Sequence, residues 1–171
     1  TMHATDFERR GFNAGVREGF IAFLPVSVGL IPWALVVGMA MTSAGFTPLQ
    51  AMGMNIIVFA GTAQLGTLPL IMDNAPLWLI LATGLALNLR FLIFSAGIAP
   101  GFRGIGTGWR WLCGHFLTDG SFAVCYDKLM QVDDPRWRLG YYVITGAWSW
   151  LLWQTFALIG IFAAGIVPKS W

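Results

Sequence analysis

The sequence has very few charged residues. Asp, Glu, Lys and Arg make up 11% of its 171 residues, whereas about 25% is usual in a soluble domain. Hydrophobic residues make up 57%, and a soluble domain of this length has too little interior to bury so much apolar surface. The net charge of +2 gives no sign of nucleic-acid binding. The composition therefore excludes an ordinary soluble protein and predicts a protein embedded in a lipid bilayer.

Motifs of enzymes and of metal sites are also missing from the sequence. The glycine-rich stretch Gly101–Gly108 has no following Lys-Ser or Lys-Thr, so it is not a phosphate-binding loop. The sequence contains no H-E-x-x-H, C-x-x-C or G-x-S-x-G. Cys113 and Cys125 lie about 18 Å apart along one expected helix, where they cannot pair, and we expect them to be apolar fillers. We therefore expect no enzyme activity, no metal and no cofactor.

The few charges leave three long apolar stretches. Residues 19–72 and 139–168 contain no Asp, Glu, Lys, Arg or His, and residues 74–102 contain only Arg90. A helix needs about 20 apolar residues to cross a bilayer, so the first stretch allows two crossings and the others one each. With one less apolar segment, we expect an all-α, polytopic bundle of about five transmembrane helices, forming a single membrane domain over residues 1–171. The expected helices are Phe20–Thr42, Pro48–Met72, one from Asp73–Pro76 to about Gly97, Trp109–Tyr126 and Leu139–Ala164.

The second expected helix has a polar, glycine-rich centre. Phe59–Thr67 contains two glycines, two threonines and Gln64, a composition that a continuous lipid-facing helix would not have. Either a neighbouring helix packs closely there or the helix unwinds, as discontinuous helices of transporters do. In the second case Gly61–Gly66 is the expected break, and the segment can turn back as a re-entrant hairpin.

The N-terminal segment, residues 1–18, is basic and is expected to lie at the membrane interface. Gly11, Gly15 and Gly19 recur every four residues, so on a helix they would form a smooth ridge that permits close helix packing. A flexible lead-in is the alternative. The positive-inside rule favours a cytoplasmic N-terminus, because six Lys and Arg then lie inside and three outside, leaving out Arg90, whether the second helix spans the membrane or re-enters. The rule does not choose between these two topologies. No cleavable signal peptide is evident.

Arg90 is the first candidate for a functional residue. It lies inside an apolar helix next to Asn88, and an arginine at the centre of a membrane helix costs about 2.5–3.5 kcal/mol on insertion scales. It should therefore face the protein interior or a water-filled cavity, where its guanidinium can hold a substrate carboxylate through two parallel bonds. The alternatives are an ion pair with Asp119 that staples the bundle, or a side chain that reaches the interface.

Two further polar groups are candidates. Asn55 and Thr62 are seven residues apart, on one face of a continuous helix, with Gln64 nearby, so they could bind substrate or join helices as polar glue. His115 and Asp119 are four residues apart and would share one helix face. A buried carboxylate or an imidazole there could carry a proton in a transport cycle. The alternative is that both groups are solvated near the interface.

Four stretches of the sequence, in order, carry a family pattern. Together they resemble the AzlC family, the large subunits of bacterial branched-chain amino-acid exporters, over about residues 12–168. The F-A-G-x-x-Q and N-L-R stretches are the most specific, and Gly120 departs from the Glu that commonly follows Thr-Asp. The stretches are Gly15–Gly19 followed by Pro25 and Gly29–Pro32, Val58–Gln64, Asn88–Arg90 followed by Ile98–Pro100, and Leu117–Asp119 leading into Ser121–Ala123.

The resemblance implies a function. It implies export of valine, leucine, isoleucine or methionine across the bacterial inner membrane, driven by the proton gradient, with a small membrane subunit resembling AzlD as partner. Family members are usually longer, so we expect a chain truncated at its C-terminus. A non-transporting scaffold or assembly subunit and a channel for a small solute are the alternatives. Arg90→Lys keeps the charge but loses the planar fork, so it should spare a scaffold and impair a carboxylate binder.

Overall fold

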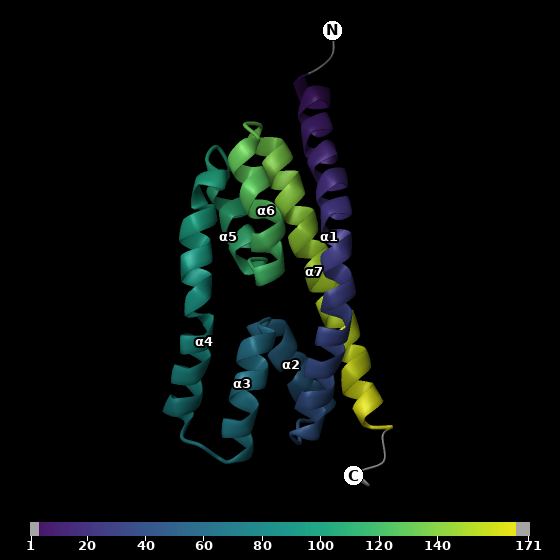
Figure 1. Ribbon diagram of the computed structural model, residues 1–171, viewed down its shortest axis with the longest axis vertical. Coiled ribbons are helices and arrows are strands. Elements are labelled where there is room, and N and C mark those ends of the chain that lie inside the picture. The colour runs from purple at the N-terminus through teal and green to yellow at the C-terminus, as the bar shows by residue number, and fades with distance from the viewer. Residues whose placement is uncertain (1–3, 167–171) are drawn as a thin grey trace. The chain divides into compact units, whose positions relative to one another are not determined.

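A computed structural model describes the main chain of residues 4–166 and the side chains from residue 11 to residue 166. The described chain is all-α, without strands, as the sequence predicts (Figure 1). Its elements are α1 (Ala4–Ser43), α2 (Pro48–Val58), α3 (Gly61–Met72), α4 (Leu77–Ile98), the short 3-10 helix η1 (Ala99–Phe102), α5 (Thr107–His115), α6 (Asp119–Gln131) and α7 (Pro135–Ala164).

Three helices of the described chain are long and apolar enough to cross a membrane. They are Gly11–Ser43 within α1, Leu77–Phe102 formed by α4 with η1, and Pro135–Ala164, with 33, 26 and 30 residues. Each exceeds the about 20 residues that a crossing needs. The three long helices predicted from the apolar stretches are therefore confirmed, and α1 and α7 begin earlier than expected.

The second predicted helix is broken into α2 and α3. The two helices lie side by side as a hairpin (Figure 1), joined by Phe59 and Ala60. With 11 and 12 residues they reach about 16 and 18 Å, well short of the about 30 Å hydrocarbon core. Unwinding is therefore the correct alternative, and the break lies just before Gly61–Gly66. The segment forms a hairpin whose two helices are each too short to cross.

The fourth predicted helix is also broken, which the sequence interpretation missed. Trp109–Tyr126 is not one helix, because α5 ends at His115 and α6 starts at Asp119. Thr118 accepts a hydrogen bond from the Ser121 main-chain N–H at 3.2 Å, and the Ser121 side chain accepts one from the Thr118 N–H at 2.8 Å. This reciprocal cap starts a new helix. The pair Thr118–Ser121 was the available signal.

The chain divides into two compact units. Unit 1 contains the chain up to Ser27 and Phe91–Trp150, and unit 2 contains Val28–Arg90 and the chain from Leu151 onward. Each long helix therefore contributes to both units, whereas the α2–α3 pair belongs to unit 2 and the α5–α6 pair to unit 1. The core of unit 1 includes Ile98, Phe102, Cys113, Cys125, Leu129, Tyr141 and Tyr142, and that of unit 2 includes Ala34, Val37, Met41, Leu68, Ala157 and Ile161.

Glycines let α1 and α7 pack with their backbones in contact. In unit 1, a Cβ atom on Gly15 would collide with the carbonyl oxygen of Trp137, and one on Gly19 would lie 2.7 Å from that of Tyr141. In unit 2, a Cβ atom on Gly38 would collide with the carbonyl oxygen of Ala157. The predicted packing role of the N-terminal glycine ridge is confirmed, because this approach leaves no room for a side chain.

Candidate functional site

The start of α3 presents an uncapped helix N-terminus in unit 2. Phe59 adopts a left-handed conformation with φ 43°, which ends α2, and Ala60 is the extended N-cap of α3 with no side-chain cap. The Gln64 N–H already bonds to the Ala60 carbonyl oxygen at 2.8 Å. The first N–H groups of a helix have no acceptor within the helix, and the helix dipole adds positive character. The residues 61–63 therefore offer main-chain donors to an anion.

Arg90 reaches this helix start from α4. Its Nη2 donates a hydrogen bond to Thr62 Oγ1 at 3.1 Å, and its side chain is half-buried. A guanidinium and a helix N-terminus thus lie together within unit 2, an arrangement suited to a carboxylate. Asp119 belongs to unit 1, and the alternative in which it pairs with Arg90 stays a prediction.

Aromatic rings pack against the same helix start. A Cβ atom on Gly61 would lie 2.6 Å from Trp153 Cη2 and 2.7 Å from Trp33 Nε1, so only a glycine fits there. Phe59 packs edge-on against Trp153, with ring centroids 6.5 Å apart. Trp33 is 40% exposed, so part of an aromatic surface stays accessible next to the cationic end of α3. Such a surface suits an apolar side chain.

Asn55 and Gln64 form the centre of a buried polar network. Asn55 Oδ1 accepts hydrogen bonds from Trp153 Nε1 at 2.7 Å and from Gln64 Nε2 at 3.1 Å. Asn55 Nδ2 donates to Gln154 Oε1 at 2.7 Å, and Gln154 Nε2 donates to the Asn55 carbonyl oxygen at 3.1 Å. Asn55 is 2% and Gln64 0% exposed. The network therefore joins both helices of the α2–α3 hairpin to α7.

The directions of these hydrogen bonds follow from the indole group. Trp153 Nε1–H can only donate, so the Asn55 atom that faces it must be the oxygen. The Gln64 atom next to that oxygen must then be the nitrogen, which leaves Gln64 Oε1 as a buried acceptor. Within the described residues this oxygen has no hydrogen-bond partner. Any group that meets it must be a donor.

The predicted common face of Asn55 and Thr62 is wrong. A spacing of seven residues places two side chains on one face only in a continuous helix, and the chain breaks between these residues at Phe59 and Ala60. Thr62 contacts Arg90, whereas Asn55 contacts Gln64 and α7. The contacts of Asn55 and Gln64 correspond to the alternative of polar glue between helices.

The sequence analysis did not predict two partners in this network, and the structure places one candidate, Asn88, outside it. Trp153 and Gln154 were not singled out, although a glutamine in the charge-free stretch 139–168 was a signal for them. Asn88 lies two residues before Arg90 on α4, so the two side chains leave the helix in different directions. The Asn88 amide oxygen is buried without a hydrogen-bond partner in the part of the chain that the structure describes.

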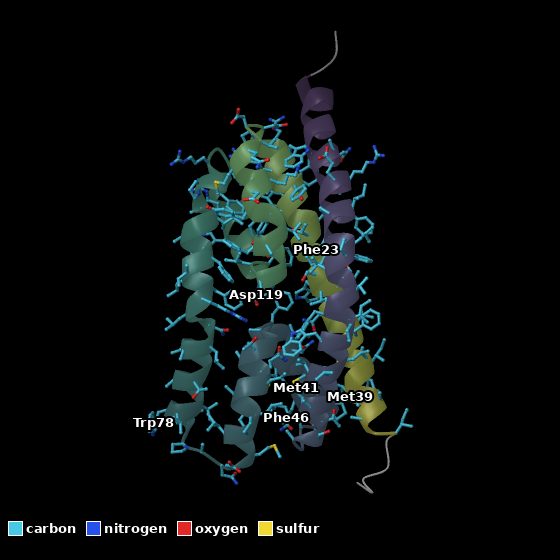
Figure 2. The ribbon with its side chains drawn as sticks, viewed as in Figure 1. Phe23, Met39, Met41, Phe46, Trp78 and Asp119 are labelled. Carbon is cyan, nitrogen blue, oxygen red and sulfur yellow. The ribbon has the colours of Figure 1, made fainter. Side chains whose placement is uncertain are left out.

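The sequence interpretation expected His115 and Asp119 to share one helix face, and they do not. His115 is the last residue of α5 and Asp119 the first of α6, because the chain between them is not helical. Both side chains are exposed in the described structure, and Asp119 marks the start of α6 in Figure 2. The acidic side chain of Asp119 in the first turn of α6 interacts favourably with the dipole of that helix. Their role in proton coupling stays a prediction.

Comparisons with known proteins agree with the predicted family. The family model described as "AzlC protein" matches residues 25–167. The chain is 26% identical over 152 residues to the inner membrane protein YgaZ of Escherichia coli, covering 88% of this chain and 62% of that protein. It is 27% identical over 128 residues to an uncharacterized membrane protein of Archaeoglobus fulgidus, covering 75% of this chain and 55% of that protein. No solved structure matches. The chain thus spans less than two thirds of the length of these relatives.

Proposed function

This chain belongs to the AzlC family of membrane proteins, and on that premise we propose that it is a secondary-transporter subunit that exports branched-chain or similar apolar amino acids. Valine, leucine, isoleucine and methionine are the proposed substrates. The observation that carries the proposal is the hydrogen bond from Arg90 to Thr62 at the uncapped start of α3. We propose that this position receives the substrate carboxylate.

The contrast between the starts of α3 and α6 supports this assignment. The start of α6 is closed by its own side chains, because Thr118 and Ser121 cap it and Asp119 already supplies a negative charge in the first turn. The start of α3 has no side-chain cap and no acidic residue in its first turn. An external anion is therefore favoured at α3 and disfavoured at α6.

The aromatic surface next to α3 supports an apolar substrate. Trp33 and Trp153 lie against Gly61 at the same helix start that carries Thr62. A carboxylate held by Arg90 would leave the rest of a small amino acid close to these rings. Burial of a leucine or valine side chain against them would add about 1.5–3 kcal/mol if complete. A polar or charged side chain would lose this contribution.

Two further parts of the proposal concern energy and assembly. We propose that the proton gradient drives export, with His115 and Asp119 as the candidate proton carriers, and that a small membrane subunit resembling AzlD is the partner. Efflux that continues after a protonophore collapses the gradient would contradict the coupling and favour a channel.

The test is efflux of radiolabelled leucine from preloaded cells that express the full-length protein with its small partner. Arg90→Lys keeps the charge but loses the fork. Loss of one charge-assisted hydrogen bond worth about 1.5–3 kcal/mol predicts roughly 10- to 100-fold slower efflux. Arg17→Lys, at an exposed position of α1, is the matched control and should transport like wild type.

Two outcomes contradict the proposal. Wild-type efflux that persists unchanged in Arg90→Lys would remove Arg90 from the carboxylate site. No leucine efflux from folded, partnered wild type would remove leucine export and favour another solute or a scaffold. Membrane expression and thermal unfolding of each variant, measured in parallel, separate a transport defect from a folding defect.

A further inference from the structure

A small groove lies in unit 1, outside the proposed substrate site. It has a volume of about 210 Å³ and lies between the end of α4 with η1 and the helix α5. Ile98, Ala99, Phe102 and Leu117 supply apolar walls, and the Tyr142 hydroxyl at the groove already donates to the Cys113 carbonyl oxygen at 2.8 Å. Pockets that enclose a whole drug-sized ligand measure about 300–1,000 Å³. This groove therefore suits one apolar part of a larger amphiphile.

Arginines gather at η1 beside the groove. Arg110 lines the groove, and its Nη2 donates to the Phe102 carbonyl oxygen at 3.0 Å. Arg138 Nη2 donates to the next carbonyl oxygen, that of Arg103, at 2.9 Å. Each guanidinium has five N–H donors, so most of them are available beyond these main-chain bonds.

The described residues do not neutralise these positive charges. In the portion that the structure describes, no carboxylate forms an ion pair with Arg103, Arg110 or Arg138. The nearby Asp134 uses its Oδ1 to accept from the Arg136 main-chain N–H at 3.0 Å. The groove thus has an apolar wall and an excess of cationic donors at one edge.

Exposed tryptophans mark the same helix as interfacial. Trp109 and Trp111 of α5 are 46% and 80% exposed, and tryptophans of membrane proteins concentrate at the level of the lipid headgroups. Basic pockets between membrane helices at that level bind anionic headgroups. We propose that the groove binds one anionic glycerophospholipid, with the phosphate at Arg110 and its neighbours and part of one acyl chain along Ile98, Phe102 and Leu117.

The chemistry favours this ligand over its nearest alternatives. A free phosphate would meet the arginines but leave the apolar walls unused. A zwitterionic lipid would bring its own cation next to Arg103, Arg110 and Arg138. No carboxylate among the described residues forms an ion pair with these arginines, so none offsets the repulsion between them and that cation. An anionic lipid satisfies both features of the groove, and each arginine near the surface contributes about 1 kcal/mol to such binding.

The test measures the thermal unfolding midpoint of the purified full-length protein in detergent, with added phosphatidylglycerol, phosphatidylcholine or inorganic phosphate. A ligand that binds the folded state raises the midpoint in proportion to its affinity. Phosphatidylglycerol should raise the midpoint at the lowest concentration, whereas phosphatidylcholine and phosphate should have little effect at that concentration.

Two pairs of variants locate the site. Arg110→Gln should weaken phosphatidylglycerol binding roughly fivefold, whereas Arg17→Gln, which removes the same charge from an exposed site on α1, should not. Gly114→Leu should fill the groove and weaken binding, whereas Gly108→Leu, on the same helix, should not. A Cβ atom meets no other atom within 4 Å at either glycine, so both variants should fold.

Each remaining outcome overturns the proposal. An equal shift with phosphatidylcholine would mean general solvation by lipid, and an equal shift with inorganic phosphate would mean a simple anion site. An unchanged phosphatidylglycerol shift in both Arg110→Gln and Gly114→Leu would place the lipid elsewhere. Because leucine efflux is measured separately, none of these results depends on the proposed transport function.

Discussion

At the scale of single residues, Asn55 is the point on which the buried network of unit 2 depends. It bonds to Trp153, Gln64 and Gln154 at once. Asn55→Ala would remove the acceptor of the buried Trp153 Nε1–H and leave Gln64 Nε2 with only its contact to Met41 Sδ at 3.5 Å, and each stranded buried group costs about 1–3 kcal/mol. We expect Asn55→Ala to lower the free energy of unfolding by more than about 3 kcal/mol.

The matched variant for this prediction is Gln154→Ala, which removes only the link to Asn55. We expect it to cost about 1–3 kcal/mol. Denaturant unfolding of the purified protein measures both free energies. Equal effects of the two variants would contradict the role of Asn55 as the common partner.

At the scale of elements, the glycines between α1 and α7 set how closely these helices pack. Gly38→Ala would bring a Cβ atom into the carbonyl oxygen of Ala157, whereas a Cβ atom on Gly53 of α2 meets open space. Overpacking against backbone costs about 1–3 kcal/mol, while alanine in place of an open helical glycine gains up to about 1 kcal/mol. Thermal unfolding should show Gly38→Ala destabilised and Gly53→Ala unchanged or stabilised.

The broken helices differ in how far the sequence could predict them. Gly61 and Gln64 in an apolar run indicated the first break, because such residues are unfavourable in a lipid-facing helix. The second break, before Asp119, carried only a local capping signal at Thr118 and Ser121. A periodic pattern cannot reveal such a break when both helices continue to bury apolar residues. Here Cys113 of α5 and Cys125 of α6 are both buried.

At the scale of the whole molecule, the breaks in the second and fourth predicted helices change the expected membrane topology. Three crossings place residues 44–76 on one side, and this stretch contains no Lys or Arg. Apart from Arg90, every Lys and Arg from Arg9 to Arg138 then lies on the N-terminal side. The positive-inside rule therefore predicts a cytoplasmic N-terminus with three crossings.

Single cysteines at Ser43, Asp73 and Gly106 test this topology. In intact cells, a membrane-impermeant maleimide should label positions 43 and 73 but not position 106. Five crossings with the same N-terminus would protect position 73 and label position 106. Cys113 and Cys125 are 2% and 0% exposed and should stay unlabelled, which the parent protein verifies.

The sequence by itself determined that the protein is an all-α membrane protein with three long apolar stretches that can cross a bilayer, although it allowed two crossings in the first stretch. It also determined that Arg90 in an apolar helix needs a polar partner. These conclusions follow from composition and length, because the bilayer imposes its thickness and its low polarity on every crossing segment. The family pattern was likewise readable from short runs such as Asn88–Arg90.

Only the tertiary structure decided which polar residues meet. It joined Arg90 to Thr62 and Asn55 to Gln64, Trp153 and Gln154, and it separated His115 from Asp119 at a helix boundary. The reason is that side-chain contacts depend on where a helix breaks and which neighbour it then packs against. A shift of two residues around a helix reverses the face that a side chain occupies, and no pattern along the chain specifies that choice.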